Sequence, residues 1–400
     1  MEIIPGGVTA PKGFMASGRA CGIKKDGSYD IALVCADDTA IASGVFTTNA
    51  VKGHSLQMTM EHIKDGRAKA VIINSGNANA CVGEKGKADA AEVANQAAKL
   101  LNCRSEDILF NSTGVIGVPL DMDAVRAGIK DVIASKSYEG GHDAARAIMT
   151  TDLSVKEFAL EFEVGSAKAR IGGMAKGSGM IHPNMATMIG VITTDVNITQ
   201  NLMEKAFKEA VNTSFNRISV DGDTSVCDMV VIMSSQKAGN NVINKEDSEY
   251  IAFKDALGIV CGHLAKEIVK DGEGATKLIE ITAEGAKTQE DAYKIVCAVA
   301  KSPLVKTAIF GEDANWGRII TAAGYSGAFF DYESADIFIG DLMVCNKGAA
   351  VAFDECRAKE ILKKDEIKIL IRLNTGNCRD RMWTCDFSYD YIKINGSYRS

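Results

Sequence analysis

Residues 156–192 read KEFALEFEVGSAKARIGGMAKGSGMIHPNMATMIGVI, and this stretch decides the class of fold. Apolar side chains alternate from Phe158 to Val164, a Gly165-Ser166 turn follows, and a second run begins at Ala167. Alternation with a period of two around a glycine turn is typical of an antiparallel hairpin. A hairpin argues against a purely parallel, doubly wound sheet, so we expect layered mixed sheets with helices outside.

The second half of this stretch combines glycines with unusual polar residues. Its simplest interpretation is a glycine-rich loop that leads into a buried strand, Met188 to Ile192. A chemical role stays open beside it. Lys176 is a lone cation, and the hydroxyl group of Thr187 follows the small residue Ala186.

Further elements follow outward from this hairpin. Apolar spacing of three and four residues predicts helices, and apolar or alternating runs predict strands. The expected helices are 87–101, whose apolar face includes Ala91, Ala94 and Ala98, and 124–134, 200–211 and 247–269; the expected strands are 70–73, 229–233, 278–282, 337–339 and 367–373.

The composition is that of an ordinary soluble globular protein. The 400 residues suggest two domains or one large one, and 46% are hydrophobic and 24% charged. Acidic residues outnumber basic ones, 52 to 45, so a broad surface for nucleic acid is not expected. Polar residues interrupt the uncharged run from Gly177 to Thr194, which favours burial over a membrane span. With no signal-like first residues, we expect a cytoplasmic protein.

Metal and nucleotide sites find no support in the sequence. The eleven cysteines form no CxxC pair, and no two of the five histidines are four residues apart, so no metal site is expected. The segment Gly83 to Lys87 does not satisfy the phosphate-loop pattern, and His182 occupies the place of the third glycine of a dinucleotide motif. We therefore expect no cofactor.

Two other polar segments have both a structural and a chemical interpretation. Backbone N–H groups of the turn from Asn111 to Gly117 could stabilise an oxyanion, although a plain turn from strand to helix is commoner. Glu273 stands between two glycines, where a solvated turn is the simpler interpretation. Neither segment identifies a reaction by itself.

Together, eight blocks in order along the chain resemble the ornithine acetyltransferase family. These enzymes of the cyclic arginine pathway move acetyl from N-acetylornithine to glutamate. The blocks are Phe46 to Asn49, Asn74 to Asn79, Ser112 to Gly117, Lys176 to Ile181, Pro183 to Met188, Asp221 to Ser225, Gly311 to Arg318 and Asp390 to Asn395.

The resemblance implies a layered α-β-β-α sandwich of the self-cleaving aminopeptidase and ornithine acetyltransferase type, with a smaller C-terminal α/β part. It also implies self-cleavage between Ala186 and Thr187. The products would be an α chain, 1–186, and a β chain, 187–400, with Thr187 as its N-terminal nucleophile. The chemistry agrees, because an α-amine has a pKa of about 7.7 to 8.0 and can accept the proton of the neighbouring hydroxyl group.

The resemblance further assigns the roles of individual residues. Thr113 and Gly114 would form the oxyanion hole beside the nucleophile. The reaction would be ping-pong, through an acetyl-Thr187 intermediate. Substrate contacts would come from Thr150, Lys176, Thr187, Glu273, Asn395 and Ser400. We expect Lys176 to pair with a substrate carboxylate and Glu273 with an ammonium group.

Alternatives and departures remain. Some members of the family also accept acetyl-CoA as donor, and no residue here decides that question. A self-cleaving aminopeptidase of the same fold is the second hypothesis, and a non-catalytic binding protein is the third. The family suggests two α and two β chains. Ser400 replaces the usual terminal Thr, and Val226 and Cys227 replace a hydroxyl group and an amide.

Overall fold

The computed structural model describes residues 1–182 and 188–397. Two compact units divide the chain, and each is described by itself. Among the described residues, the larger unit contains 1–182, 188–216 and 223–268, and the smaller one contains 217–222 and 269–397. The boundary between the units therefore does not coincide with the predicted cleavage site.

A mixed sheet forms the centre of the larger unit. In the described part of the chain it has nine strands in the order β1-β6-β7-β8-β10-β3-β4-β5, with β2 paired to β3. The strands are β1 (Glu2–Ile4), β2 (Phe14–Arg19), β3 (Ile31–Phe46), β4 (Arg67–Asn77), β5 (Ile108–Val115), β6 (Lys156–Val164), β7 (Ala167–Lys176), β8 (Ile189–Thr194) and β10 (Met229–Ser234). The helices are α1 (His54–His62), α2 (Gly83–Leu101), α3 (Met122–Ala134), α4 (Gly141–Ala147), α5 (Gln200–Thr213) and α6 (Ser248–Lys270).

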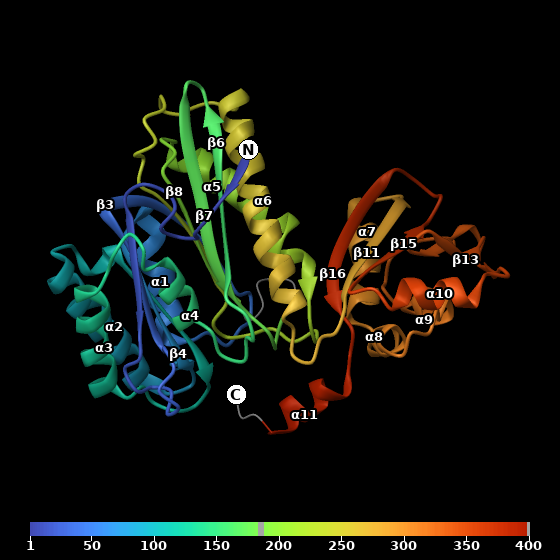
Figure 1. Ribbon diagram of the computed structural model, residues 1–400, viewed down its shortest axis with the longest axis horizontal. Coiled ribbons are helices and arrows are strands. Elements are labelled where there is room, and N and C mark those ends of the chain that lie inside the picture. Colours follow the sequence, from blue (N-terminus) through green and yellow to red (C-terminus); the bar gives the residue numbers. More distant parts are fainter. Residues whose placement is uncertain (183–187, 398–400) are drawn as a thin grey trace. The chain divides into compact units, whose positions relative to one another are not determined.

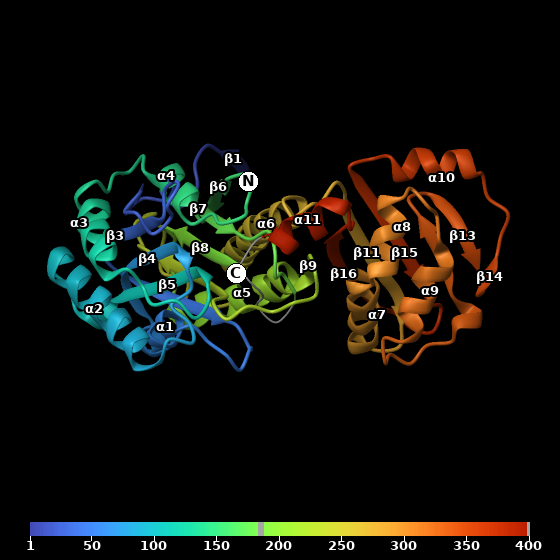
Figure 2. The same cartoon turned by 90° about the horizontal axis from the view of Figure 1, so that it is seen from below.

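This sheet turns back on itself and forms two layers between helices. One buried cluster joins the two layers and includes Val71 and Leu109 from β4 and β5, and Val191 and Val231 from β8 and β10. A second cluster lies between β3, β4 and β5 and the helices α2 and α3. Figures 1 and 2 show α2 and α3 outside one layer and α5 and α6 outside the other. The expected α-β-β-α arrangement is confirmed.

The predicted hairpin is β6 and β7, which pair antiparallel with Val164 opposite Ala167. The expected helices and strands also form, with bounds that extend by a few residues. Two details of the sequence analysis were wrong. On α2, Ala94 and Ala98 are buried as predicted, but Ala91 is exposed. The turn expected from Asn111 begins later, because β5 pairs with β4 as far as Val115.

The smaller unit consists of a second sheet with helices packed against it. Within the described residues its sheet has seven strands in the order β14-β13-β12-β15-β11-β16-β9. Ile281, Ile369 and Met382 of this sheet pack against Ile295 and Val299 of a covering helix. The strands are β9 (Ile218–Ser219), β11 (Leu278–Ala286), β12 (Asp336–Ile339), β13 (Leu342–Asn346), β14 (Ala349–Ala350), β15 (Glu366–Arg372) and β16 (Cys378–Cys385), and the helices are α7 (Gln289–Lys301), α8 (Pro303–Phe310), α9 (Trp316–Gly324), α10 (Glu355–Leu362) and α11 (Tyr389–Ser397).

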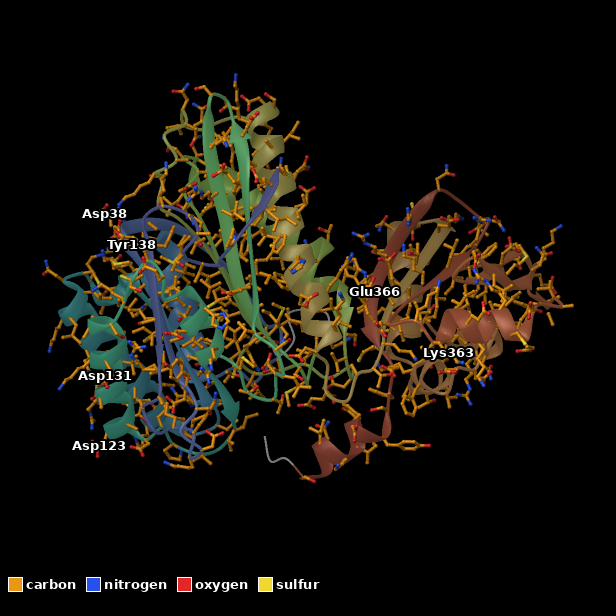
Figure 3. All side chains as sticks on the ribbon, in the orientation of Figure 1. Asp38, Asp123, Asp131, Tyr138, Lys363 and Glu366 are labelled. Carbon is orange, nitrogen blue, oxygen red and sulfur yellow. The ribbon has the colours of Figure 1, made fainter. Side chains whose placement is uncertain are left out.

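Charged side chains occupy the outer faces of the helices. Figure 3 shows Asp123 and Asp131 of α3 pointing away from the sheet, while Val125 and Ile129 of the same helix are buried. This division of polar and apolar faces is what the helical spacing predicted. Across residues 1–182 and 188–397, no helix is long and apolar enough to cross a membrane.

Candidate functional site

Lys176, the last residue of β7, lies in a buried polar cluster. Its Nζ donates a hydrogen bond to Oγ1 of Thr150 over 2.7 Å and lies 3.8 Å from Oδ2 of Asp152. Oδ1 of Asp152 accepts hydrogen bonds from Nζ of Lys156 at 2.8 Å and from the backbone N–H of Gly177 at 2.7 Å. Two predicted substrate contacts, Thr150 and Lys176, are therefore in direct contact.

The carboxyl group of Asp152 keeps its charge in the interior. Burial alone would raise its pKa, but the charges of Lys176 and Lys156 and several hydrogen bonds hold the pKa well below its ordinary value. Within these contacts one carboxylate faces two ammonium groups. Because Lys156 makes the shorter ion pair, Lys176 is the cation that can bind an additional anionic group, such as a substrate carboxylate.

The last part of β5 contains a glycine that the backbone conformation requires. Gly114 has a φ of +132°, and a Cβ at this position would lie 2.4 Å from the carbonyl carbon of Gly76 on β4. Thr113 precedes it and is 2% exposed. The end of β5 therefore has a close backbone approach that a side chain at residue 114 would disturb.

The end of β5 is tied to the loop before β10. Nδ2 of Asn111 donates to the carbonyl oxygen of Cys227 at 2.8 Å. Val226 and Cys227 belong to a small buried cluster with Ala78 and Ala80. The two departures from the family pattern have therefore placed apolar side chains where they pack against apolar neighbours.

Asp228 and β10 hold the residue that precedes β8. Oδ1 of Asp228 accepts a hydrogen bond from the N–H of Met188 at 3.0 Å, and the N–H of Met229 donates to the carbonyl oxygen of Met188 at 3.1 Å. Asp228 is 0% exposed, and burial raises the pKa of its carboxyl group well above the ordinary value. On the other side of β8, Ile189 pairs with Lys176.

The smaller unit contains a second pair of predicted substrate contacts. Nδ2 of Asn395, on α11, donates to Oε2 of Glu273 at 2.8 Å. Glu273 is 7% exposed and lies in the loop after α6. A Cβ on Gly274 would lie 2.4 Å from the backbone nitrogen of Tyr391, so this loop packs closely on the start of α11. The neighbour of Glu273 thus packs on the same helix that carries Asn395.

The structure brings the predicted residues together in three groups. Thr150 and Lys176 form one contact, Glu273 and Asn395 form another, and Thr113 and Gly114 end β5. The predicted residues Ala186, Thr187 and Ser400 lie outside the described residues.

Two buried carboxyl groups were not predicted. Asp152 has no motif around it, since its lysine partners are recognised only in the folded chain. Asp228 did leave a signal, because an acidic residue directly precedes the apolar run that begins at Met229. In the described ranges, no three His, Cys, Asp or Glu side chains gather as metal ligands, and all eleven cysteines are free.

Fold and site together define a layered α-β-β-α protein with a buried lysine and a positive-φ glycine near the ends of its central strands. Comparison with known proteins then identifies the family, because the model of the ArgJ family matches residues 15–400. The arginine biosynthesis bifunctional protein ArgJ of Symbiobacterium thermophilum is 52% identical over 402 residues, which cover 100% of both chains. The chain belongs to the ArgJ family, and the resemblance predicted from the sequence is confirmed.

Solved structures include further relatives. The arginine biosynthesis bifunctional protein ArgJ of Bacillus halodurans is 44% identical, with a TM-score of 0.50, and the match covers 52% of this chain and 97% of that one. Ornithine acetyltransferase from Mycobacterium tuberculosis, complexed with ornithine, is 39% identical, with a TM-score of 0.41, and the match covers 46% of this chain and 97% of that one.

Proposed function

We propose that this chain cuts itself between Ala186 and Thr187 and then transfers acetyl from N-acetylornithine to glutamate through an acetyl-Thr187 intermediate. Family membership and the 52% identical arginine biosynthesis relative support this reaction. The geometric observation that carries the proposal is the buried contact of Lys176 with Thr150. The register of β7 and β8 pairs Lys176 with Ile189, two residues after Thr187 in the sequence.

The cut converts one peptide bond into a catalyst. Oγ1 of Thr187 bonds to the carbonyl carbon of Ala186, the carbon–nitrogen bond breaks, and the nitrogen gains the proton of the hydroxyl group. Water then hydrolyses the ester, which leaves a carboxylate on Ala186 and restores the hydroxyl group of Thr187 beside its free amine. The solved Bacillus halodurans chain supports this step, since it spans only about half of the present chain.

The new amine is the base for the acetyl transfer. An α-amine with a pKa of about 7.7 to 8.0 is partly neutral near pH 7 and can take the hydroxyl proton as the oxygen attacks the acetyl carbon. The oxyanion would be stabilised by donors at Thr113 and Gly114, and each such donor contributes about 2.7 to 4 kcal/mol. Ornithine leaves as an amine, and the amine of glutamate then takes the acetyl group from Thr187.

The predicted charged residues suit the charged groups of an amino-acid substrate. We assign Lys176 to a substrate carboxylate because its partner Asp152 is shared with Lys156. Glu273 would accept hydrogen bonds from a substrate ammonium group, with Asn395 orienting its carboxylate. Thr150 and Ser400 would complete the substrate contacts with hydroxyl groups.

We further propose a cytoplasmic enzyme without a bound cofactor that assembles from two α and two β chains. Eleven free cysteines support a reducing compartment. Strand pairs across the cut support a stable association of the α and β chains, because β8 pairs with β7 and β10 pairs with β3.

Intact mass spectrometry tests the first step. We expect the purified chain as two products of 186 and 214 residues, and the Thr187→Ala variant as one uncut, inactive chain. Incubation of the cut enzyme with N-acetylornithine should add one acetyl group to the β chain. Acetyl transfer by the uncut Thr187→Ala variant would contradict the proposal.

Two assays separate the remaining alternatives. Release of ornithine from N-acetylornithine should depend on glutamate; release at the same rate without glutamate would favour a hydrolase such as an aminopeptidase. Glutamate with acetyl-CoA as the sole donor decides whether the enzyme also makes N-acetylglutamate from acetyl-CoA.

A further inference from the structure

The proposed mechanism gives no role to the buried carboxyl group of Asp228, which directly precedes β10. Its side chain is 0% exposed, and its backbone is fixed by Thr47, whose N–H donates to the carbonyl oxygen of Asp228 at 3.1 Å. Among the residues that the structure describes, Oδ2 makes no hydrogen bond of ordinary geometry, although the hydroxyl group of Thr47 and the backbone N–H of Ser225 act on the carboxyl group and lower its pKa. A buried polar atom without a good hydrogen bond lowers the stability of the fold. A carboxyl group that is kept at such a cost is a candidate for a functional role.

The contact made by the other oxygen indicates what the group does. Oδ1 accepts a hydrogen bond from the N–H of Met188 at 3.0 Å, across 40 positions of sequence. That N–H belongs to the peptide bond between Thr187 and Met188. Since consecutive Cα atoms are about 3.8 Å apart, a contact that fixes Met188 restricts where its neighbour can lie.

Self-cleavage depends on this restriction. The attacking oxygen and the carbonyl carbon must approach to about 3 to 3.5 Å in the correct direction, and a misplacement of about 1 Å can cost 10²-fold in rate. The carbonyl group of Met188 is held by the N–H of Met229. Its N–H is held by Asp228, so loss of that side chain releases the side of Met188 that faces the cut.

We propose that Asp228 is a positioning residue for self-cleavage, which acts by holding the amide of Met188. This inference rests on the proposed function, because it concerns the same cut. Burial raises the pKa of this carboxyl group and thus favours its protonated form. Asparagine has the shape of that form and keeps the acceptor oxygen, so it is the conservative replacement.

The chain offers a matched control at the opposite end of β8. Asp195 directly follows β8 and is also 0% exposed. Its carboxylate accepts hydrogen bonds from the backbone N–H groups of Arg170 at 2.7 Å and Lys12 at 3.0 Å. Asp195→Ala therefore removes an equally buried carboxyl group from the same strand, at the end away from the cut.

The experiment follows self-cleavage of the full chain by intact mass after cell-free synthesis, which sets the zero time. Asp195→Ala should cut within about threefold of the wild-type rate. Asp228→Ala should cut at least about 100-fold more slowly, and Asp228→Asn within about tenfold of wild type. Asp228→Leu keeps the volume of the buried site and should behave as Asp228→Ala, which provides a second test if the alanine variant does not fold.

Hydroxylamine distinguishes positioning from later chemistry, because it cleaves the ester once the ester has formed. We expect no hydroxylamine-induced cut in folded Asp228→Ala or Asp228→Leu. The inference would be overturned if these two variants cut at the rate of Asp195→Ala, or if hydroxylamine revealed accumulated ester in them. It would also be overturned if Asp228→Asn cut as slowly as Asp228→Ala. An uncut wild-type chain, or a cut Thr187→Ala chain, would instead overturn the proposed function.

Discussion

Replacing Gly114 with alanine tests whether the end of β5 stabilises the oxyanion. The new Cβ would lie 2.4 Å from the carbonyl carbon of Gly76 and 2.6 Å from the backbone nitrogen of Asn77. Ordinary Cβ contacts stay beyond 3.0 Å, so the end of β5 must shift by about 0.6 Å to accommodate the methyl group. Both obstructing atoms belong to the backbone of β4, so neither can rotate out of the way.

A shift of this size is enough to displace a hydrogen-bond donor. Removal of one oxyanion donor typically costs about 10²- to 10³-fold in kcat, and we expect Gly114→Ala to lose about 10²-fold. Alanine at a φ of +132° also adds strain of about 1 to 3 kcal/mol to the folded state. Gly117→Ala is the control for that strain, because Gly117 has a φ of +80° and no atom within 4 Å of its would-be Cβ.

The assay measures kcat for acetyl transfer by the cut enzyme and, separately, the fraction of cut chain by intact mass. Gly117→Ala should lose stability but keep kcat near the wild-type value. Gly114→Ala should lose a similar amount of stability and, in addition, about 10²-fold in kcat. If the two variants transfer acetyl at rates within threefold of each other, the end of β5 does not stabilise the oxyanion and the reasoning is refuted.

Three further predictions concern charged side chains. Lys176→Met should lower kcat/KM for N-acetylornithine by about 10- to 100-fold through loss of a charged hydrogen bond, whereas Lys156→Met should lower the free energy of unfolding by about 3 to 5 kcal/mol, measured in urea. Glu273→Gln, which can still accept from Asn395, should raise KM while the melting temperature stays close to that of wild type. Burial lowers the pKa of Lys306, so near its folded pKa the folded state binds fewer protons than the unfolded state. The free energy of unfolding should therefore rise as the pH approaches 10.5. Urea titrations should show that Lys306→Met removes this rise.

The sequence predicted the individual helices and strands better than it predicted which strands pair with each other. The hairpin of β6 and β7 follows from local alternation around Gly165, and the apolar face of α3 follows from helical spacing. The pairing of β8 with β10 joins segments separated by an entire helix, and no local pattern specifies it. On α2, the predicted burial of Ala94 and Ala98 is confirmed and that of Ala91 was wrong, because a single alanine has too little apolar surface to decide which face is buried.

The site shows the same division between local and distant information. Blocks of sequence identified Lys176, since its neighbours form a recognisable motif, whereas Glu273 was assigned only through the family resemblance. Asp152 was missed because its role depends on two lysines brought together by folding. Buried carboxyl groups carry no periodicity, so only their three-dimensional partners distinguish them from solvated ones.

The order of folding and cutting follows from these distant contacts. The N–H of Met188 finds its acceptor, Asp228, only when the start of β8 lies beside the start of β10. That pairing belongs to the centre of a sheet whose other strands, β7 and β3, precede the proposed cut. An unfolded chain has none of these contacts and cannot align the bond before Thr187. Cleavage is therefore expected only after the larger unit has folded. The two products then remain associated, because strands before the cut pair with strands after it.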